Sequence, residues 1–353
     1  MRIPTEPIGS IPRPPELIEA VTAGSISDPN LDPHYEAAVK DTIERFEETD
    51  SPIITDGEQR KYHNFWTYSV HGLTNTAPDG FRIPFSAGHL RRMPRLTSGP
   101  FRYKRYAYSY LEVALKYAHR PLKQAVISPS ALSLMYPADA IPGYSRDEFI
   151  EDLLGEHEKE VRGCLVKGAA KVQIDFTEAR FAMKVDPTGE LLNAFIDLNN
   201  LALARFSDAE RKQIGVHTCP GADRDSTHSA DVDYAEFLPL LFQLNVGSFC
   251  IALAGEPDRT KVLEIIRDNI RPDQRIFVGV VSPIDPHIDT PHEVCSRVLE
   301  ASKYIPLEQF GTTDDCGFAP FSDDLSTSRD TAFEKIRARV EGTAMATDMI
   351  GRG

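Results

Sequence analysis

The sequence predicts a single (β/α)8 barrel of the α/β class. Short apolar or β-branched runs that end in polar residues alternate with longer stretches of helical spacing. Eight such runs occur within 353 residues, a length that suits one large barrel. A doubly wound open sheet is the alternative, but no glycine-rich phosphate loop follows any run, which favours the barrel. We therefore expect residues 1–353 to form one catalytic barrel.

The expected elements follow one another regularly along the chain. The strands are expected at 8–11, 52–56, 124–128, 171–176, 213–219, 248–254, 275–282 and 310–316. The helices are expected at 34–49, 105–118, 145–168, 188–206, 232–244, 259–269, 290–303 and 327–346. Residues that favour helix N-termini, such as Ser145, Asp258 and Thr290, stand at the start of several of them. The stretch 61–105 is too long for a simple loop, so we expect an insertion after the second strand that lies over the barrel mouth.

Composition and charge exclude several classes of protein. The chain has 39 Lys and Arg against 53 Asp and Glu, a net charge of −14, which disfavours a nucleic-acid partner. No apolar run approaches the roughly 18 residues of a membrane span, and the N-terminus lacks an export signal pattern, so we expect a cytoplasmic protein without a membrane partner. The five cysteines are expected to be free thiols or ligands. The oligomeric state is left open, a homo-oligomer included.

Candidate functional residues follow the expected strands, where barrel enzymes carry their chemistry. His217 and Cys219 are two residues apart at the end of the fifth strand, so their side chains point to the same face. Together with Cys316 after the eighth strand they offer two thiolates and one imidazole, a set that suits Zn²⁺ and leaves a position for substrate. Glu256, after the sixth strand, is the candidate fourth ligand.

Each of these candidates has a plainer alternative. His217 and Cys219 could be a buried histidine and a small packing thiol, and Glu256 a surface carboxylate at the start of a helix. The remaining cysteines, at positions 164, 250 and 295, are expected to pack in the core. Zinc with two thiolate ligands suits activation of a substrate thiol, and this favours S-alkylation over hydrolysis.

The chain resembles the cobalamin-independent methionine synthase superfamily, specifically its catalytic C-terminal barrel. Five segments match in order: PIGSIPRPPEL, TDGEQRKYHNF, KVQIDFTEARF, GVHTC and TDDCGF. The resemblance implies zinc at His217, Cys219 and Cys316. It also implies that the amino acid part of a homocysteine-like thiol binds to Ile8, Gly9, Ser10, Glu58 and Asp175. A carboxylate pair suits an ammonium group, although Glu58 and Asp175 could instead form an internal ion pair with an arginine.

Several positions depart from the family pattern and are similar to its short, single-barrel relatives. The stacking tryptophan of the family is replaced by Met135 or Tyr136, and the sole tryptophan, Trp66, is elsewhere in the sequence. The proton-donating histidine of an IHSP segment is replaced by Ile284. His287, three residues further on, is the candidate catalytic proton donor, with Asp175 as the second catalytic candidate.

The expected function is that of a zinc-dependent S-methyltransferase that activates a homocysteine-like thiol. The alternatives are a zinc-dependent thiol alkyltransferase or lyase of the epoxide–coenzyme M transferase type, and a barrel that has lost activity. The alkyl donor is left open between a folate, a corrinoid on a partner protein and a strained electrophile. Six basic residues between positions 91 and 105 could hold a polyanionic donor tail or a partner protein, or pair with acidic residues of the same chain.

Overall fold

Six parallel strands form the central sheet of the computed structural model, which describes residues 2–23, 29–62, 64–85, 88, 90–222 and 226–352. Their spatial order is β10-β9-β8-β7-β6-β5, the reverse of their order in the chain. Their bounds are β5 (Lys123–Ile127), β6 (Lys171–Asp175), β7 (Ile214–Thr218), β8 (Ser248–Ile251), β9 (Arg275–Val281) and β10 (Phe310–Asp314). These elements confirm the last six of the eight expected strands.

The first two expected strands are extended segments that complete the ring without forming regular ladders. Thr5 pairs in parallel with Thr312 of β10 at one edge of the sheet, and Ile54 pairs with Leu122 beside β5 at the other. The two segments also meet each other, because the Ile11 amide donates to the Gly57 carbonyl at 3.0 Å. The fold is therefore the expected (β/α)8 barrel.

The prediction of a regular strand over 8–11 was wrong in detail. The pairing of the N-terminal segment with β10 occurs at Thr5, not within 8–11. Pro7 and Pro12 flank the expected strand, and proline has no N–H to donate to a ladder. Pro52 limits the segment before Ile54 in the same way.

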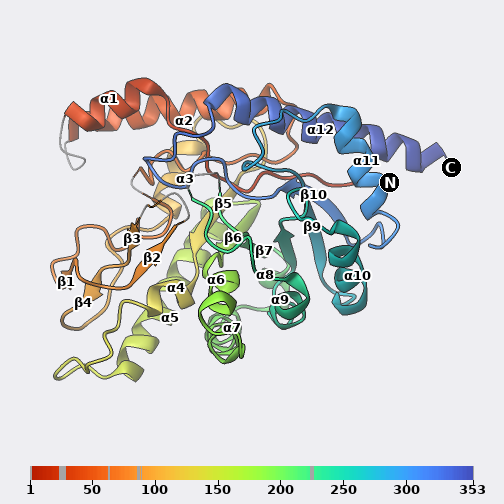
Figure 1. The fold of residues 1–353 in the computed structure, drawn as a ribbon. Helices are drawn as coiled ribbons and strands as arrows, with labels where there is room; N and C mark the ends of the chain where they lie inside the picture. The colour runs from red at the N-terminus through yellow and green to blue at the C-terminus, as the bar shows by residue number, and fades with distance from the viewer. Residues whose placement is uncertain are drawn as a thin grey trace.

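Helices surround the sheet (Figure 1), and each of the eight expected helices is present with somewhat different ends. The longer helices are α1 (Pro15–Ala23), α2 (Asp32–Glu47), α5 (Arg146–Lys167), α6 (Glu178–Val185), α7 (Glu190–Leu203), α9 (Tyr234–Leu241), α10 (Arg259–Asn269), α11 (Pro291–Ala301) and α12 (Arg329–Arg352). The short ones are η1 (Pro29–Leu31), α3 (Tyr108–Ala114), α4 (Pro129–Ser133) and α8 (Asp208–Arg211). Of all these helices, α1, η1, α4, α6 and α8 were not predicted from the sequence. The three expected caps hold: Ser145, Asp258 and Thr290 each accept from a backbone amide three residues on.

The first and last parts of the chain lie side by side in this arrangement. Phe46 of α2 and Phe333 of α12 are in edge-to-face contact, with ring centroids 5.3 Å apart. Figure 1 shows the two helices along the same side of the barrel. Within the described parts of the chain, no helix combines the length and the apolar character that a membrane crossing requires.

The stretch 61–105 contains two small antiparallel sheets beside the barrel (Figure 1): β1 (Thr76–Ala77) pairs with β4 (Arg95–Leu96), and β2 (Arg82–Pro84) with β3 (Leu90–Arg92). Two buried carboxylates of α5 accept hydrogen bonds from residues near the two ends of this stretch. Glu160 accepts from the Tyr68 hydroxyl and the Ala107 amide, both at 2.8 Å, and Glu156 accepts from the Tyr103 amide at 3.0 Å. The role of this stretch as a lid stays a prediction.

Three of its basic side chains pair with acidic residues of the same chain. Arg91 contacts Asp323 at 2.6 Å, Arg95 contacts Asp79 at 3.0 Å, and Arg102 contacts Asp152 at 2.5 Å. For these arginines the structure favours internal pairing over a free basic surface.

The barrel interior below the mouth contains a buried ion cluster. The Glu6 carboxylate lies 3.2 Å from Lys123 Nζ and 2.8 Å from Lys171 Nζ. Burial alone would raise the pKa of Glu6, but the two lysines outweigh it and lower that pKa to about 2. The buried Glu6 carboxylate is therefore paired inside the protein.

We predict that Lys123→Met destabilises the protein by about 3 kcal/mol, because it leaves the buried Glu6 carboxylate with one cation instead of two. Urea unfolding measures the change. The matched control is Arg95→Ala, which removes an exposed ion pair worth about 0–1 kcal/mol. Since the pKa of Glu6 is lowered from 4.5, its stabilising effect is present above about pH 4.5 and is lost as the pH falls towards 2. Equal effects of the two substitutions would contradict this account.

Candidate functional site

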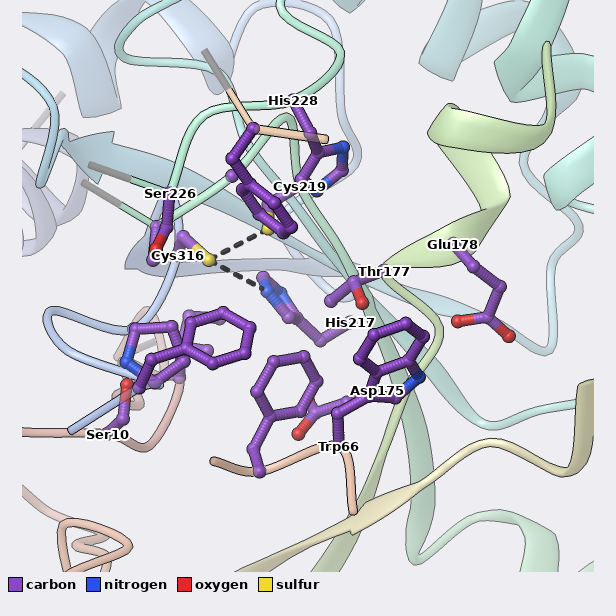
Figure 2. A pocket seen from close by; sticks show the side chains of 18 of the residues that line it. Ser10, Trp66, Asp175, Thr177, Glu178, His217, Cys219, Ser226, His228 and Cys316 are labelled. Atoms are coloured by element: carbon purple, nitrogen blue, oxygen red, sulfur yellow. Dashed lines mark hydrogen bonds between the residues drawn. The ribbon is translucent and has the colours of Figure 1, made fainter. Parts of the chain in front are cut away.

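Two strand ends bring the three expected metal ligands together (Figure 2). His217 lies on β7, Cys219 follows it directly, and Cys316 follows β10. The Cys219 and Cys316 sulfurs are 2.8 Å apart, and the Cys316 sulfur lies 3.5 Å from His217 Nε2. All three side chains are buried, and their ligand atoms lie within 4.8 Å of one another. A metal ion could be held by this arrangement.

The three groups perturb one another's protonation strongly. Burial by itself raises the pKa of the Cys219 thiol, but the hydrogen bond with Cys316 and the charge of His217 outweigh it and hold that pKa well below its ordinary value. Burial and the neighbouring Cys219 sulfur raise the pKa of Cys316 well above its ordinary value. Burial lowers the pKa of His217, yet Cys219 and Asp175 reverse this and raise it. A soft divalent cation would replace the shared protons of this cluster.

The cluster opens into a cavity of about 640 Å³, counting the space at its open mouth. Four other residues expected in substrate binding line the same cavity: Ile8, Ser10, Glu58 and Asp175. The opposite walls are largely apolar. They include Phe65, Trp66, Ile83 and Phe85 from the stretch 61–105, together with Phe181 and Phe321.

Two buried carboxylates face this cavity. The Glu58 backbone is left-handed, with φ of 57°, and its amide donates to Asp56 Oδ1 at 2.9 Å. Lys61 Nζ lies 3.0 Å from Glu58 Oε2, so the internal ion pair that was the alternative exists, but with a lysine in place of an arginine. Burial first, and the charge of Glu58 second, raise the pKa of Asp175 to about 6. A cation entering the cavity would relieve both effects.

Gly9 does not line the cavity but positions Glu58. A Cβ atom at position 9 would lie 2.6 Å from Glu58 Oε1, closer than real contacts allow. The absence of a side chain at this position therefore lets the Glu58 carboxylate lie against the N-terminal segment.

Glu256 and His287 lie apart from this arrangement. The Glu256 carboxylate is 2.7 Å from the guanidinium of Arg180, a buried residue of α6 that needs a counter-charge. It does not belong to the three-residue metal cluster found among the described residues. The His287 side chain is 52% exposed and bonded to Glu293 at 3.2 Å, and it does not line the cavity. Their roles as ligand and proton donor stay predictions.

Three cavity residues escaped the sequence analysis. Trp66 lines the cavity although its place in the sequence suggested otherwise. Glu178 begins α6 three residues after Asp175, a spacing that could have signalled it. His228 follows Cys219 in a loop, and burial lowers the pKa of its imidazole to about 4, so the ring is neutral at neutral pH.

The fold and this cavity define a class: a barrel enzyme with a cysteine- and histidine-based centre at the carboxyl ends of its strands. The sequence profile described as "Cobalamin-independent synthase, Catalytic domain" matches residues 3–337. The chain belongs to this family and is a methyltransferase of it.

Individual relatives agree in length and fold. The chain is 24% identical to "Methionine synthase" of Sulfurisphaera tokodaii over 98% of this chain and 93% of that protein. It is also 24% identical to "Uncharacterized protein YxjH" of Bacillus subtilis, over 94% and 91%. The solved structure of a B12-independent methionine synthase from Shewanella sp. W3-18-1, in complex with selenomethionine, superposes with a TM-score of 0.71 at 17% identity, covering 100% of both chains. A methyltransferase from Methanosarcina mazei gives 0.53 at 12% identity, covering 99% and 94%.

We predict that iodoacetamide alkylates Cys219 first in chelator-treated protein, because the lowered pKa of this thiol favours its thiolate and the residue lines the cavity. Peptide mapping by mass spectrometry identifies the modified residue. Cys250 is the internal comparison, since burial raises the pKa of its thiol to about 12. Alkylation of Cys250 at the same rate would contradict the proposed electrostatics.

Proposed function

We propose that the protein transfers a methyl group to the sulfur of a homocysteine-like thiol, with Zn²⁺ held by His217, Cys219 and Cys316. The observation that carries the proposal is the convergence of these three ligands and of two buried carboxylates on one cavity. The methyltransferase family gives the reaction class. The names of the relatives, "Methionine synthase" among them, support methionine as the product.

The donor set fits zinc by its own chemistry. Two thiols and an imidazole converge in a buried place, and the His217 Nδ1 atom has no hydrogen-bond partner among the described residues. Zinc, when bound there, supplies a Lewis acid that favours the deprotonated form of an acceptor thiol at neutral pH.

The chain itself binds and orients the acceptor. Glu58 and Asp175 supply negative charge to an ammonium group, and Lys61 neutralises only part of it. Ser10 lies close to Gly317, the residue that follows Cys316. A Cβ atom at position 317 would be 2.1 Å from Ser10 Oγ. The acceptor is then held between the carboxylates and the cluster, which is the proximity that methyl transfer requires.

A thiol alkyltransferase that opens an epoxide is the second candidate. Its support is the departure from the family pattern at Ile284, which stands where the family has its proton-donating histidine. The nearby His287 is 52% exposed and does not line the cavity. Product analysis with homocysteine and coenzyme M as acceptors separates the two candidates.

We predict that the protein binds one equivalent of zinc and that Cys219→Ser and Cys316→Ser each weaken binding at least tenfold, since a ligand sulfur is lost. Competition with a chromophoric chelator measures the affinity. Cys250→Ser is the control, because that thiol is buried outside the cluster and should retain full affinity. Zinc binding that survives both ligand substitutions would refute the assignment.

We predict that Asp175→Ala raises the KM for homocysteine at least tenfold while zinc content is unchanged, because one of the two charges facing the ammonium group is removed. Gly9→Ala should raise the KM in the same direction by displacing Glu58. Steady-state methionine formation measures both. An unchanged KM in Asp175→Ala would contradict the proposal that Glu58 and Asp175 bind the ammonium group of the acceptor.

A further inference from the structure

Glu178 is a buried carboxyl group that neither the metal cluster nor the proposed acceptor site uses. It begins α6, is 4% exposed and lines the cavity. Figure 2 shows its carboxylate on the opposite side of the view from Cys219 and Cys316, with His217, Thr177 and Trp66 between them. A molecule that reaches from the metal cluster across the cavity would end near this group.

The hydrogen bonds around Glu178 leave one of its oxygens free. The hydroxyls of Ser128 and Ser130 both reach Oε1. Each serine oxygen already accepts a hydrogen, from the Ala131 amide at 3.1 Å and from Asn199 Nδ2 at 2.8 Å, so its single O–H is directed at Glu178. Oε2 is buried and has no partner among the described residues. Two donors at Oε1 and none at Oε2 fit a neutral carboxyl group with its proton on Oε2.

The surroundings support the neutral form. Burial raises the pKa of Glu178 to about 7, against the two serine hydrogen bonds, and the charge of Asp175 raises it further. Among the described residues no cation is paired with Glu178, whereas Glu58 has Lys61 and Glu256 has Arg180. Near neutral pH the group can therefore give up or take a proton.

The other titratable groups near the cavity suit this task less well. His228 is neutral at neutral pH and its Nδ1 bonds to the Ser229 hydroxyl at 2.9 Å. Asp175 accepts from Gln173 Nε2 at 2.8 Å and is assigned to the acceptor. His287 lies outside the cavity.

We propose that Glu178 is a catalytic acid that protonates the leaving atom of the alkyl donor from Oε2. The inference rests on the proposed function. It restricts the donor to one whose leaving atom gains a proton, an amine nitrogen or an alkoxide oxygen, and it excludes a methylated corrinoid, whose cobalt leaves without one.

The step balances without a further reactant. The acceptor sulfur forms the new S–C bond, the donor's C–N or C–O bond breaks, and its electron pair stays on the leaving atom. The Oε2 proton moves to that atom, and water returns a proton to the Glu178 carboxylate, matching the one that the acceptor thiol released on binding.

The test compares Glu178→Gln with the native protein in alkylation of homocysteine by different donors. Glutamine keeps an oxygen for the two serine hydroxyls and is neutral, so the fold should be retained, but it cannot donate a catalytic proton. We expect kcat with 5-methyltetrahydrofolate, or with epoxypropane, to fall about 10²–10⁴-fold. With methyl iodide, whose leaving group needs no proton, kcat should change by less than about threefold. A parallel loss with all donors, no loss with any, or use of methylcobalamin alone would overturn the proposal.

A second readout does not depend on turnover. Infrared difference spectra of zinc-free protein across pH should show a protonated carboxyl group that titrates near 7 and is absent from Glu178→Gln. Glu160→Gln is the matched control: burial raises the pKa of Glu160 to about 7 as well, but this residue lies outside the cavity. The Glu160→Gln variant should lose the infrared band of Glu160 and should keep the native relative rates with the different alkyl donors. If no such band is lost in Glu178→Gln, the proposal fails even where methyl transfer is confirmed. If the band is lost but homocysteine is never alkylated, the proposed function fails and the protonated state of Glu178 stands.

Discussion

Burial of ionisable side chains inside the barrel is the constraint on which the rest of this structure depends. A charge removed from water must be paired, protonated or bound by a ligand. The two ends of the barrel meet this requirement differently. Below the mouth, Lys123 and Lys171 hold the pKa of Glu6 at about 2. The Glu6 carboxylate is thus paired inside the protein and needs no partner from outside.

The cavity end is left incompletely compensated. The pKa values of Asp175 and Glu178 are raised to about 6 and about 7, and the cluster of Cys219, Cys316 and His217 shares protons that a metal would displace. In the proposed function, each deficit is met by a positive species: a metal ion, an ammonium group or a proton. The stretch 61–105 adds an apolar wall to the same cavity with Phe65, Trp66 and Phe85. The reactive arrangement is thus the part of the barrel that the fold leaves unneutralised.

The sequence predicted the barrel and the core of the site because both depend on local patterns. Strand ends are visible as apolar runs that stop at polar residues, and parallel strands bring those ends together whatever the details of packing. The HxC spacing and Cys316 therefore sufficed to predict that His217, Cys219 and Cys316 converge in a cluster that could hold a metal ion. The first strand was misplaced because prolines break its ladder. Contacts between residues far apart in the sequence could not be predicted from local patterns. Arg180 on α6 forms an ion pair with Glu256. Trp66, in the stretch 61–105, lines the cavity although its position in the sequence does not indicate this.

The most direct test of the account is zinc X-ray absorption of the purified protein with and without homocysteine. The account predicts a centre with two sulfur ligands and one or two nitrogen or oxygen ligands, which gains a third sulfur when homocysteine is added. A protein without stoichiometric zinc, or a two-sulfur centre that homocysteine leaves unchanged, would contradict the claim that the cavity activates this thiol.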